Sequence, residues 1–438
     1  MTLLASLRAR DYAESIGQRA QAYVAPFSEE ERMSAQLDLW NIEWQRLLAS
    51  VPYYQRLRGE LNLPDRFDCW QGFVDRVPVT TRATVQKKGN EMTSSEKAPD
   101  CWRATGGSTA QPIQIPAWNQ EEAFTRYDMW LGRSWYGVSP DSRLFLLWGH
   151  SHLLGTGIKG WIKGRKRKVF DWLMGYYRFS AYELRPQALR RAARELLNFK
   201  PDYVIGYSVA LDLFARANAD LRDELHSVGV KVVVGTAESF PASESAALLE
   251  DLFGCPVAME YGAMETGLVA HTHPRGGYRV FWKSYFVEAE RDDAAPEGLT
   301  VRVTSLYPRC LPLVRYELGD QIQTSDPKAE RAIGIATFER VLGRCNAYAV
   351  LQDGAMVHSE AFSHAVRACS EITSYQVIQR GPDVQLHYTS RQCLTEQALA
   401  PVRVRLAKVH PLLAAVEMRK VDVLQQTIAG KTPMVIRE

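Results

Sequence analysis

The sequence predicts an α/β protein with a large N-terminal domain of α/β subdomains, residues 1–343, and a small, mobile α+β domain, residues 344–438. The main observation is the alternation of strand-like and helix-like segments between Tyr203 and Tyr261, which is typical of a parallel sheet with covering helices. A second is the change to short alternating strands over 278–340. A third is the length of 438 residues, which is enough for two or three hydrophobic cores.

Helices are predicted for most of the first hundred residues. The segment from Ser28 to Ser50 begins with a cap-like serine and acidic residues, and continues with apolar residues at helical spacing. Pro64 and Pro78 mark the end of this region. Further helices are expected at 120–136, 186–198, 211–225, 243–253 and 395–409. Strands are expected at 142–148, 203–205, 230–234, 256–261, 300–304, 347–351, 374–378 and 384–388.

Composition excludes several classes of protein. Hydrophobic residues make up 46% of the chain and charged residues 24%, and the net charge of +3 is too small to indicate a nucleic-acid partner. The seven cysteines are scattered and form no CxxC pair, which argues against a disulfide framework and a cysteine-rich zinc site. Met1 to Leu7 is too short for a signal-peptide core, and no uncharged apolar run is long enough to span a bilayer. The expected location is the cytoplasm.

The first candidate site segment is ATGGSTAQPIQIP, residues 104–116. A Gly/Ser/Thr turn offers backbone N–H groups and hydroxyls without side-chain bulk, so it can surround phosphate oxygens. No GK[ST] follows that would make it a Walker loop, and an ordinary glycine-rich turn explains the segment when it is taken alone. Its candidate phosphate-binding residues are Thr105, Gly106, Gly107, Ser108 and Thr109.

Two further segments follow predicted strands. GTAES, residues 235–239, comes after a run of valines, and EYGAMETG, residues 260–267, comes after the next strand. Ligands bind at the carboxyl ends of strands in open α/β sheets. Beside phosphates, the Glu265 carboxylate would suit Mg²⁺, which takes oxygen ligands. The alternatives are an ordinary strand-to-helix turn and an acid at a helix N-terminus.

The fourth segment is PLVRYELGD, residues 312–320. A carboxylate at Asp320, at the end of a Gly-Asp turn, can accept hydrogen bonds from both hydroxyls of a ribose. Arg344 lies a short strand later and would reach the same ribose or a phosphate. Taken alone, a turn aspartate and a surface arginine are the simpler interpretations.

Together these segments resemble the adenylate-forming superfamily of acyl-CoA synthetases, adenylation domains and luciferases, in its phenylacetate-CoA ligase-like branch with the capsule-biosynthesis-like relatives. ATGGSTAQP resembles the phosphate loop, and GTAES with YGAMETG resembles the adenine loop and the YGxTE motif. RYELGD resembles the ribose motif, LGR the strand before the hinge, and AGKTPMVIRE the terminal segment with the catalytic lysine. Five motifs in the family's order are far more specific than any one of them.

The resemblance implies a role for each matching residue. Lys431 would contact the acyl carboxylate and the α-phosphate, Thr266 the α-phosphate, and Glu265 the magnesium ion. Asp320 and Arg344 would hold the ribose. Around the adenine it implies Glu238 and Tyr261, and the phosphates would be bound by Thr105, Gly106, Gly107, Ser108 and Thr109. The implied contacts to the acid are His150, His152, Tyr207, Gly235 and Gly262.

The implied activity is ATP- and Mg²⁺-dependent adenylation of a carboxylic acid, with an aryl or arylalkyl acid favoured. The acyl group would then pass to a thiol, either coenzyme A or a carrier protein. Two alternatives stay open: transfer to an amine or another nitrogen nucleophile, and a non-catalytic nucleotide-binding relative. No nucleic acid and no transmembrane segment are implied.

The chain departs from the family pattern at two places. The phosphate loop ends in Ala110, Gln111 and Pro112, where a glycine and a lysine or arginine usually precede the proline. The hinge position after the arginine holds Cys345 and Asn346 instead of a charged residue. A cation for the pyrophosphate is therefore missing from the loop, and an amine acceptor becomes credible beside the usual thiol.

Two other features have no assigned role. His271 and His273 lie where some relatives carry a zinc site, but no cysteine is near, so a solvated or core pair is favoured. Lys159 to Lys168 is a basic run with one tryptophan. It would suit the phosphates of coenzyme A, an acidic carrier protein or an anionic membrane surface, and a solvated loop is the simpler interpretation.

Overall fold

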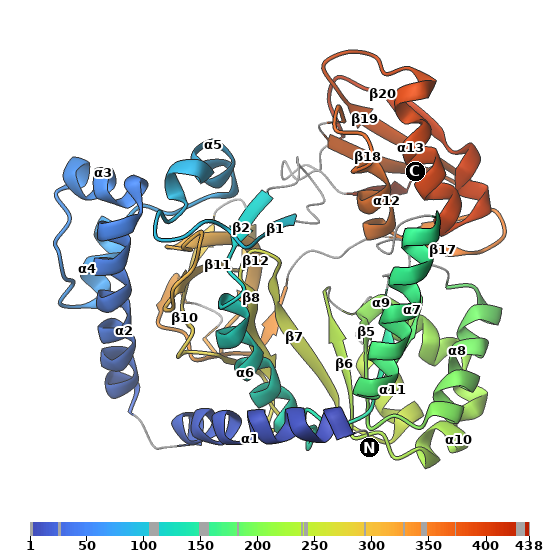
Figure 1. Ribbon diagram of the computed structural model, residues 1–438, viewed down its shortest axis with the longest axis horizontal. Helices are drawn as coiled ribbons and strands as arrows, with labels where there is room; N and C mark the ends of the chain where they lie inside the picture. Colours follow the sequence, from blue (N-terminus) through green and yellow to red (C-terminus); the bar gives the residue numbers. More distant parts are fainter. Residues whose placement is uncertain are drawn as a thin grey trace.

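A computed structural model describes residues 3–24, 28–104, 114–148, 157–181, 184–237, 240, 244–292, 295–326, 329–342, 348–372, 374–425 and 434–437. The chain forms an N-terminal helical region, two large sheets and a C-terminal α/β unit (Figure 1). Within these ranges, no helix is both long and apolar enough to cross a membrane.

The larger sheet has eight strands in the order β14-β9-β8-β7-β6-β5-β3-β4. The strands from β4 to β7 are parallel, and those from β7 to β14 are antiparallel. Its strands are β3 (Leu144–Leu147), β4 (Tyr176–Phe179), β5 (Tyr203–Tyr207), β6 (Val232–Thr236), β7 (Val257–Ala263), β8 (Gly267–Thr272), β9 (Tyr278–Val280) and β14 (Thr337–Phe338). The predicted parallel sheet is confirmed, and Val232 to Val234 are completely buried because helices cover both faces.

The helices around this sheet are α6 (Glu121–Ser134), α7 (Gly157–Met174), α8 (Pro186–Phe199), α9 (Ser208–Ala217), α10 (Arg222–Ser227) and α11 (Ser245–Phe253). The helix predicted at 211–225 is instead divided into α9 and α10. Asn218 ends α9, because its side-chain amide donates to the carbonyls of Phe214 and Leu189. A short 3₁₀ turn, Ala219–Leu221, then leads into α10.

The second sheet is antiparallel, in the order β13-β10-β11-β12-β15. Its strands are β10 (Tyr285–Asp292), β11 (Ala295–Ser305), β12 (Tyr316–Gln323), β13 (Arg331–Ile333) and β15 (Arg340–Val341). It shares one core with the N-terminal helices, in which Trp70 stacks on Phe286 with ring centres 3.6 Å apart. That shared core places β12 beside the helical region.

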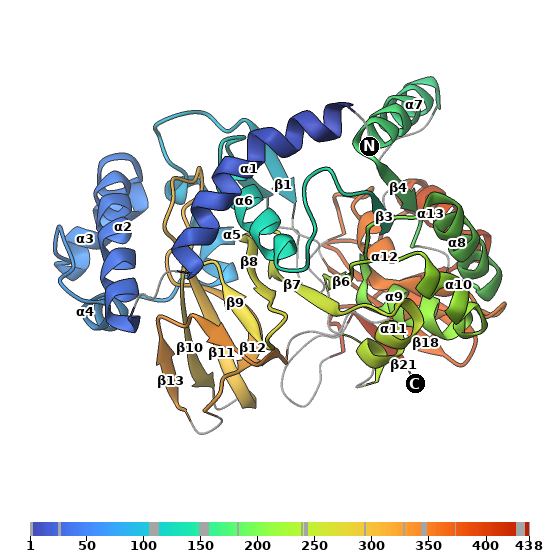
Figure 2. The ribbon, with the colours of Figure 1, turned by 90° about the horizontal axis from the view of Figure 1, so that it is seen from below.

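The N-terminal helices are α1 (Leu3–Val24), α2 (Glu29–Ser50), α3 (Pro52–Leu61), α4 (Trp70–Arg76) and α5 (Arg82–Met92), followed by the hairpin β1 (Cys101–Ala104) and β2 (Gln114–Ala117). The predicted cap at Ser28 is present: its hydroxyl accepts from the Glu31 N–H, and the Glu31 carboxylate accepts from the Ser28 N–H. Helix α1 lies along α6, where Arg19 pairs with the buried Asp128 at 2.5 Å (Figure 2).

The C-terminal residues form a separate hydrophobic core between 349 and 435. The predicted helix at 395–409 and the strands at 374–378 and 384–388 are confirmed. The elements are β16 (Tyr348–Val350), β17 (Met356–His358), α12 (Ser359–Val366), β18 (Ser374–Arg380), β19 (Asp383–Thr389), α13 (Glu396–Val409), β20 (Glu417–Lys420) and β21 (Val435–Arg437). The boundary predicted at 343/344 lies outside the described residues, and the division into two domains stays a prediction.

Gly254 provides a test of the connection between α11 and β7. It has a φ of +63°, and a β-carbon there would lie 1.9 Å from the His226 Nε2. Since the ring must move and the left-handed conformation costs about 1–2 kcal/mol, we expect Gly254→Ala to lower the free energy of unfolding by about 2–3 kcal/mol. Urea denaturation measures this loss.

The matched control is Gly229→Ala. Gly229 has a φ of +73°, but no heavy atom lies within 4 Å of the β-carbon position. This variant should lose only the cost of the left-handed conformation, about 1–2 kcal/mol. Equal losses in the two variants would show that the His226 contact does not constrain Gly254.

Candidate active site

The YGAMETG segment forms the hairpin between β7 and β8. The register shifts between Tyr261 and Gly262, so the strand is bulged just before the turn. A β-carbon at Gly262 would lie 2.1 Å from the Gly267 carbonyl oxygen, and Gly267 has a φ of +77°. Both glycines are therefore required by the backbone of this turn.

The Thr266 hydroxyl is used inside the turn. It accepts a hydrogen bond from the Ala263 N–H at 3.0 Å and donates to the Gly267 carbonyl at 2.8 Å. The residue is only 1% exposed. Thr266 thus fixes the shape of the turn in this structure, and its predicted contact with the α-phosphate stays a prediction.

The Glu265 carboxylate lies between a cation and a phenol. The Arg82 Nη1 is 3.3 Å from its Oε1, and the Tyr316 hydroxyl donates to the same oxygen at 3.3 Å. Arg82 is the first residue of α5, and the preceding Thr80 forms a parallel bridge to Tyr316. The N–H of Glu317 also donates to the Thr80 carbonyl at 2.9 Å. These backbone bonds hold the start of α5 against β12 and so bring Arg82 to Glu265.

A buried guanidinium supports the turn from behind. The Arg309 side chain is 2% exposed and donates to the carbonyl oxygens of Glu265 and Thr266. The Tyr285 hydroxyl donates to the same Thr266 carbonyl at 2.5 Å. Because burial raises the pKa of Tyr285, its hydroxyl stays protonated and able to donate. The backbone of the turn is therefore held by fixed donors.

Arg309 has a neutral and a charged partner besides the turn. The Tyr307 hydroxyl accepts from its Nη1 at 2.9 Å, and the buried Glu121 carboxylate lies 3.9 Å from its Nη2. Glu121 also accepts from the Trp118 N–H at 2.8 Å and the Cys310 N–H at 2.9 Å. The charge of this buried arginine is matched by Glu121, and both Nη atoms have acceptors, whereas its Nε is buried without a hydrogen-bond partner.

The predicted ribose residue lies beside the predicted adenine residue. The Tyr261 hydroxyl, on β7, donates to the Asp320 carboxylate on β12 at 3.4 Å. The start of β12 is anchored by the buried Arg315, whose guanidinium pairs with Glu288 at 2.6 Å. Gly319 precedes Asp320 within β12 and has a φ of +74°, at the place where the pairing of β12 with β11 changes register. Two strands from different sheets therefore place these two side chains together.

Tyr207 and Gly235 lie at the carboxyl ends of the adjacent strands β5 and β6. A β-carbon at Gly235 would lie 2.6 Å from the Met259 sulfur, so the Met259 side chain of the neighbouring strand β7 occupies this position. Tyr207 is 1% exposed and its ring lies 4.3 Å from that of Trp148. Ala237, which follows β6, has a φ of +71°, a strained conformation found at binding loops. Contacts of Tyr207 and Gly235 with the acid stay predictions.

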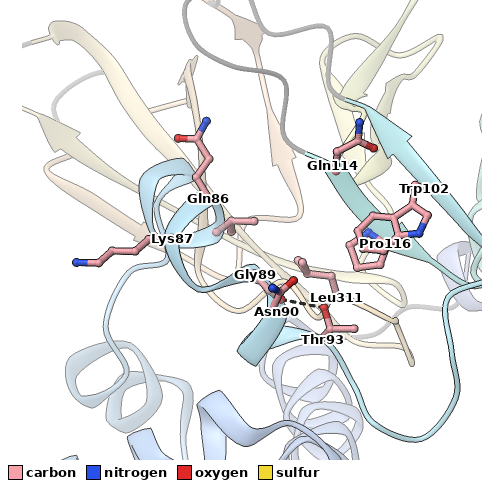
Figure 3. A pocket seen from close by; sticks show the side chains of 10 residues that line it. Gln86, Lys87, Gly89, Asn90, Thr93, Trp102, Gln114, Pro116 and Leu311 are labelled. Atoms are coloured by element: carbon pink, nitrogen blue, oxygen red, sulfur yellow. Dashed lines mark hydrogen bonds between the residues drawn. The ribbon is translucent and has the colours of Figure 1, made fainter. Parts of the chain in front are cut away.

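The remaining predicted residues lie outside the described part of the chain. They are Thr105, Gly106, Gly107, Ser108, Thr109, His150, His152, Glu238, Arg344 and Lys431. The structure does describe the two strands that flank 105–113. Their hairpin, with Trp102 and Pro116, faces the α5 residues Lys87 and Asn90 across a pocket of about 270 Å³ (Figure 3). The pocket therefore lies beside the helix that begins at Arg82.

His271 is packed inside the protein. Its Nδ1 lies 2.8 Å from the Thr272 carbonyl, and its ring lies 6.0 Å from that of Trp135. Beside it, Arg133 and Glu260 form a buried ion pair at 2.8 Å. Within the described ranges, no group of three or more His, Cys, Asp and Glu side chains is arranged to hold a metal ion. The core interpretation fits His271.

Three residues that contact Glu265 or Thr266 were not predicted from the sequence. Arg82 and Arg309 belong to none of the quoted motifs, and their partners in the turn lie more than forty positions away. Tyr316 lies inside the RYELGD motif but was given no role. Motif order alone could have singled out Tyr316. No local pattern distinguishes the two arginines from ordinary surface arginines.

Replacement of Arg309 tests the support of the turn. We expect Arg309→Met to lower the free energy of unfolding by about 3–5 kcal/mol, because it leaves the Glu121 carboxylate buried without its cation. As a control, Arg190→Met removes the exposed pair of Arg190 with Asp220 and should cost about 0–1 kcal/mol. Chemical denaturation compares the two, and similar small losses would contradict a supporting role.

His271 gives a pH-dependent prediction. Burial lowers its pKa and outweighs the nearby Glu260 carboxylate, which raises it. The unfolded chain, with a histidine pKa of about 6.5, then binds the proton more readily, so stability falls as the pH drops below about 6.5. We expect the stability advantage of the wild type over His271→Gln to shrink between about pH 7 and pH 5. Urea denaturation across this range measures it, and a constant difference would contradict the prediction.

Comparison with known proteins addresses the fold. No protein-family model matches the chain. The chain is 22% identical to protein CapK of Staphylococcus aureus over 320 residues, which are 71% of this chain and 68% of that protein. An open conformation of 2-hydroxyisobutyryl-CoA ligase, in complex with 2-HIB-AMP and CoA, is 16% identical, with a TM-score of 0.55 over 93% of this chain and 92% of that one.

A second structure of that ligase, in complex with 2-HIB-AMP and CoA in the thioesterification state, gives a TM-score of 0.58 at 16% identity, over 93% of this chain and 90% of that one. The similarity extends over nearly the whole length of both chains. It therefore includes the two sheets and the C-terminal unit. The chain therefore shares its fold with 2-hydroxyisobutyryl-CoA ligase.

Proposed function

We propose that this protein is an ATP-dependent ligase that joins a carboxylic acid to AMP, releases pyrophosphate, and then transfers the acyl group to a thiol. The observation that carries the proposal is the contact of the YGAMETG segment with β12: Tyr261 donates to Asp320, and Glu265 accepts from Tyr316. The two motifs lie far apart in the chain and belong to two different sheets. In a fold shared with a ligase that binds 2-HIB-AMP and CoA, this convergence fits a site for AMP and its acyl ester.

The proposed first step is displacement at the α-phosphorus of ATP. A carboxylate oxygen of the acid forms a bond to that phosphorus, and the bond to the pyrophosphate oxygen breaks. Asp320 would accept hydrogen bonds from the ribose hydroxyls, with Tyr261 beside it against the base. Lys431 would offset the charge of the carboxylate and the α-phosphate as they approach. Positioning and electrostatics supply most of the rate in such a reaction.

Magnesium fits the residues that are present. Mg²⁺ usually binds one or two carboxylates and completes its coordination with phosphates and water. Glu265 offers one carboxylate at the edge of the turn. It would hold the ion together with the ATP phosphates, and the ion would supply positive charge against the phosphate oxygens. The resident partner Arg82 would then be released from Glu265 and be free to face the phosphates.

The second step would transfer the acyl group to coenzyme A or to the thiol of a carrier protein, with loss of AMP. An aryl or arylalkyl acid is the proposed substrate class. Transfer to an amine is the second candidate, favoured by the uncharged Cys345 and Asn346 after the LGR motif. A non-catalytic nucleotide-binding protein is the third, favoured by the absence of a cation between Ala110 and Pro112.

Replacement of Lys431 tests adenylation directly. Purified protein, ATP, Mg²⁺ and a panel of aryl and aliphatic acids are incubated with hydroxylamine, which captures acyl-AMP, and pyrophosphate release is measured. We expect release that depends on one class of acid and that falls about 10²–10³-fold in Lys431→Ala, because a preorganised cation is lost. Lys420→Ala is the matched control and should retain activity. It removes a lysine of β20 that is paired with Asp422.

The acceptor is then identified from AMP release with coenzyme A or with amines in place of hydroxylamine. Stimulation by coenzyme A supports the thiol ligase, whereas stimulation by an amine alone supports the second candidate. ATP binding without pyrophosphate release from any acid in the panel would favour the non-catalytic candidate. Equal activity of Lys431→Ala and Lys420→Ala would remove Lys431 from the mechanism.

A further inference from the structure

Helix α7 has one side packed against the protein. Gly164, Arg167, Asp171 and Met174 recur at helical spacing and are buried or half-buried. The Asp171 carboxylate pairs with Arg178 on β4 at 2.9 Å. Positions separated by three, four and seven lie on one face of a helix. Among the described side chains of α7, the docked face is therefore a narrow stripe.

The outward side carries large apolar residues. Ile162, Val169 and Trp172 are 42%, 58% and 71% exposed, and the neighbouring Phe170 is 55% exposed. The spacing of 162, 169 and 172 places these three positions together, opposite the docked stripe. Single exposed apolar residues are common on proteins, but three on one side of one helix form a patch of the kind that marks an interaction site.

The same side is strongly basic. Arg165, Lys166 and Lys168 are exposed between the apolar positions. Helix α7 contains six lysine and arginine residues and only one acid, Asp171, whose carboxylate is already paired with Arg178. The whole chain has a net charge of only +3. With six basic residues and one acid, the helix has a net charge of +5, which exceeds that of the whole chain.

We propose that α7 is an interfacial helix that binds the protein to an anionic lipid bilayer. Ile162, Val169 and Trp172 would enter the boundary between head groups and acyl chains, and Lys166 and Lys168 would contact lipid phosphates. Figure 2 shows α7 at the periphery of the molecule, beside the N-terminal end of α1, where a flat surface can reach it. Exposed Ile, Val and Trp distinguish this surface from one built for coenzyme A phosphates, which would need the cations alone.

Vesicle co-sedimentation of the full chain tests the proposal. The probes are vesicles of phosphatidylcholine alone and vesicles of phosphatidylcholine mixed with phosphatidylglycerol, in about 0.1 M salt, where charges are screened beyond about 10 Å. We expect binding to the mixed vesicles and little binding to phosphatidylcholine alone. The double variant Lys166→Glu, Lys168→Glu should lower the partition coefficient at least about tenfold, since each cation near such a surface contributes about fivefold.

A second variant tests the apolar contribution. Val169→Ser with Trp172→Ser keeps every cation and should also lower binding at least about tenfold, because the inserted side chains are lost. The matched controls are Ile42→Ser with Val423→Ser, which remove exposed apolar residues elsewhere, and Arg391→Glu with Lys408→Glu, which reverse exposed cations elsewhere. Circular dichroism and thermal denaturation confirm that each variant is folded.

The proposal is overturned by absence of wild-type binding to the mixed vesicles, or by equal binding to both vesicle types. It is also overturned if either α7 double variant binds like the wild type, or if the controls lose as much binding as the α7 variants. Unchanged vesicle binding together with weaker use of coenzyme A in the α7 variants would assign the helix to coenzyme A phosphates instead. The vesicle-binding results do not depend on whether the chain is an active ligase.

Discussion

The buried guanidinium of Arg309 is the contact on which the geometry of the candidate site depends. It joins the β7–β8 turn to Glu121 at the start of α6 and to the segment that leads into β12. Three parts of the chain, distant in sequence, are thereby fixed relative to one another. Because a buried guanidinium needs acceptors for its Nη donors, it holds the carbonyls of Glu265 and Thr266 in place. The direction of the Glu265 side chain follows from it.

A second buried arginine performs the same task for the other strand. Arg315 pairs with Glu288 and donates to the carbonyls of Val74 and Val77, which connects the N-terminal helices to the five-stranded sheet. Its φ of +47° is strained for a non-glycine residue, and the ion pair and hydrogen bonds offset that strain. The bridge from Thr80 to β12 lies directly beside it. The start of α5, and with it the guanidinium next to Glu265, is placed by this anchor.

Whether a feature could be predicted from the sequence depends on how far apart in the sequence its interacting residues lie. The strands β5, β6 and β7 were predictable because buried parallel strands leave a local apolar run, and Asp320 because its motif is contiguous. The contacts of Arg82 and Arg309 depend on tertiary packing, which no local pattern records. For Lys159 to Lys168, the simpler interpretation as a solvated loop is wrong, because the structure shows a helix there, α7. Its docked stripe includes Gly164, Arg167 and Asp171, so the usual apolar periodicity is absent.

The two sides of the Glu265 turn differ in how easily they can change. Behind it, the Arg309 side chain is 2% exposed, and removing one partner of such a buried pair costs several kcal/mol, about 3–5. In front, the side chains of Arg82 and Glu265 are 23% and 10% exposed, so their pair lies closer to solvent than the contacts of Arg309. Pairs nearer to solvent contribute less to stability than fully buried ones. The contact of Arg82 with Glu265 is therefore the easier of the two to exchange, whereas the backbone of the turn is held by Arg309 from the buried side.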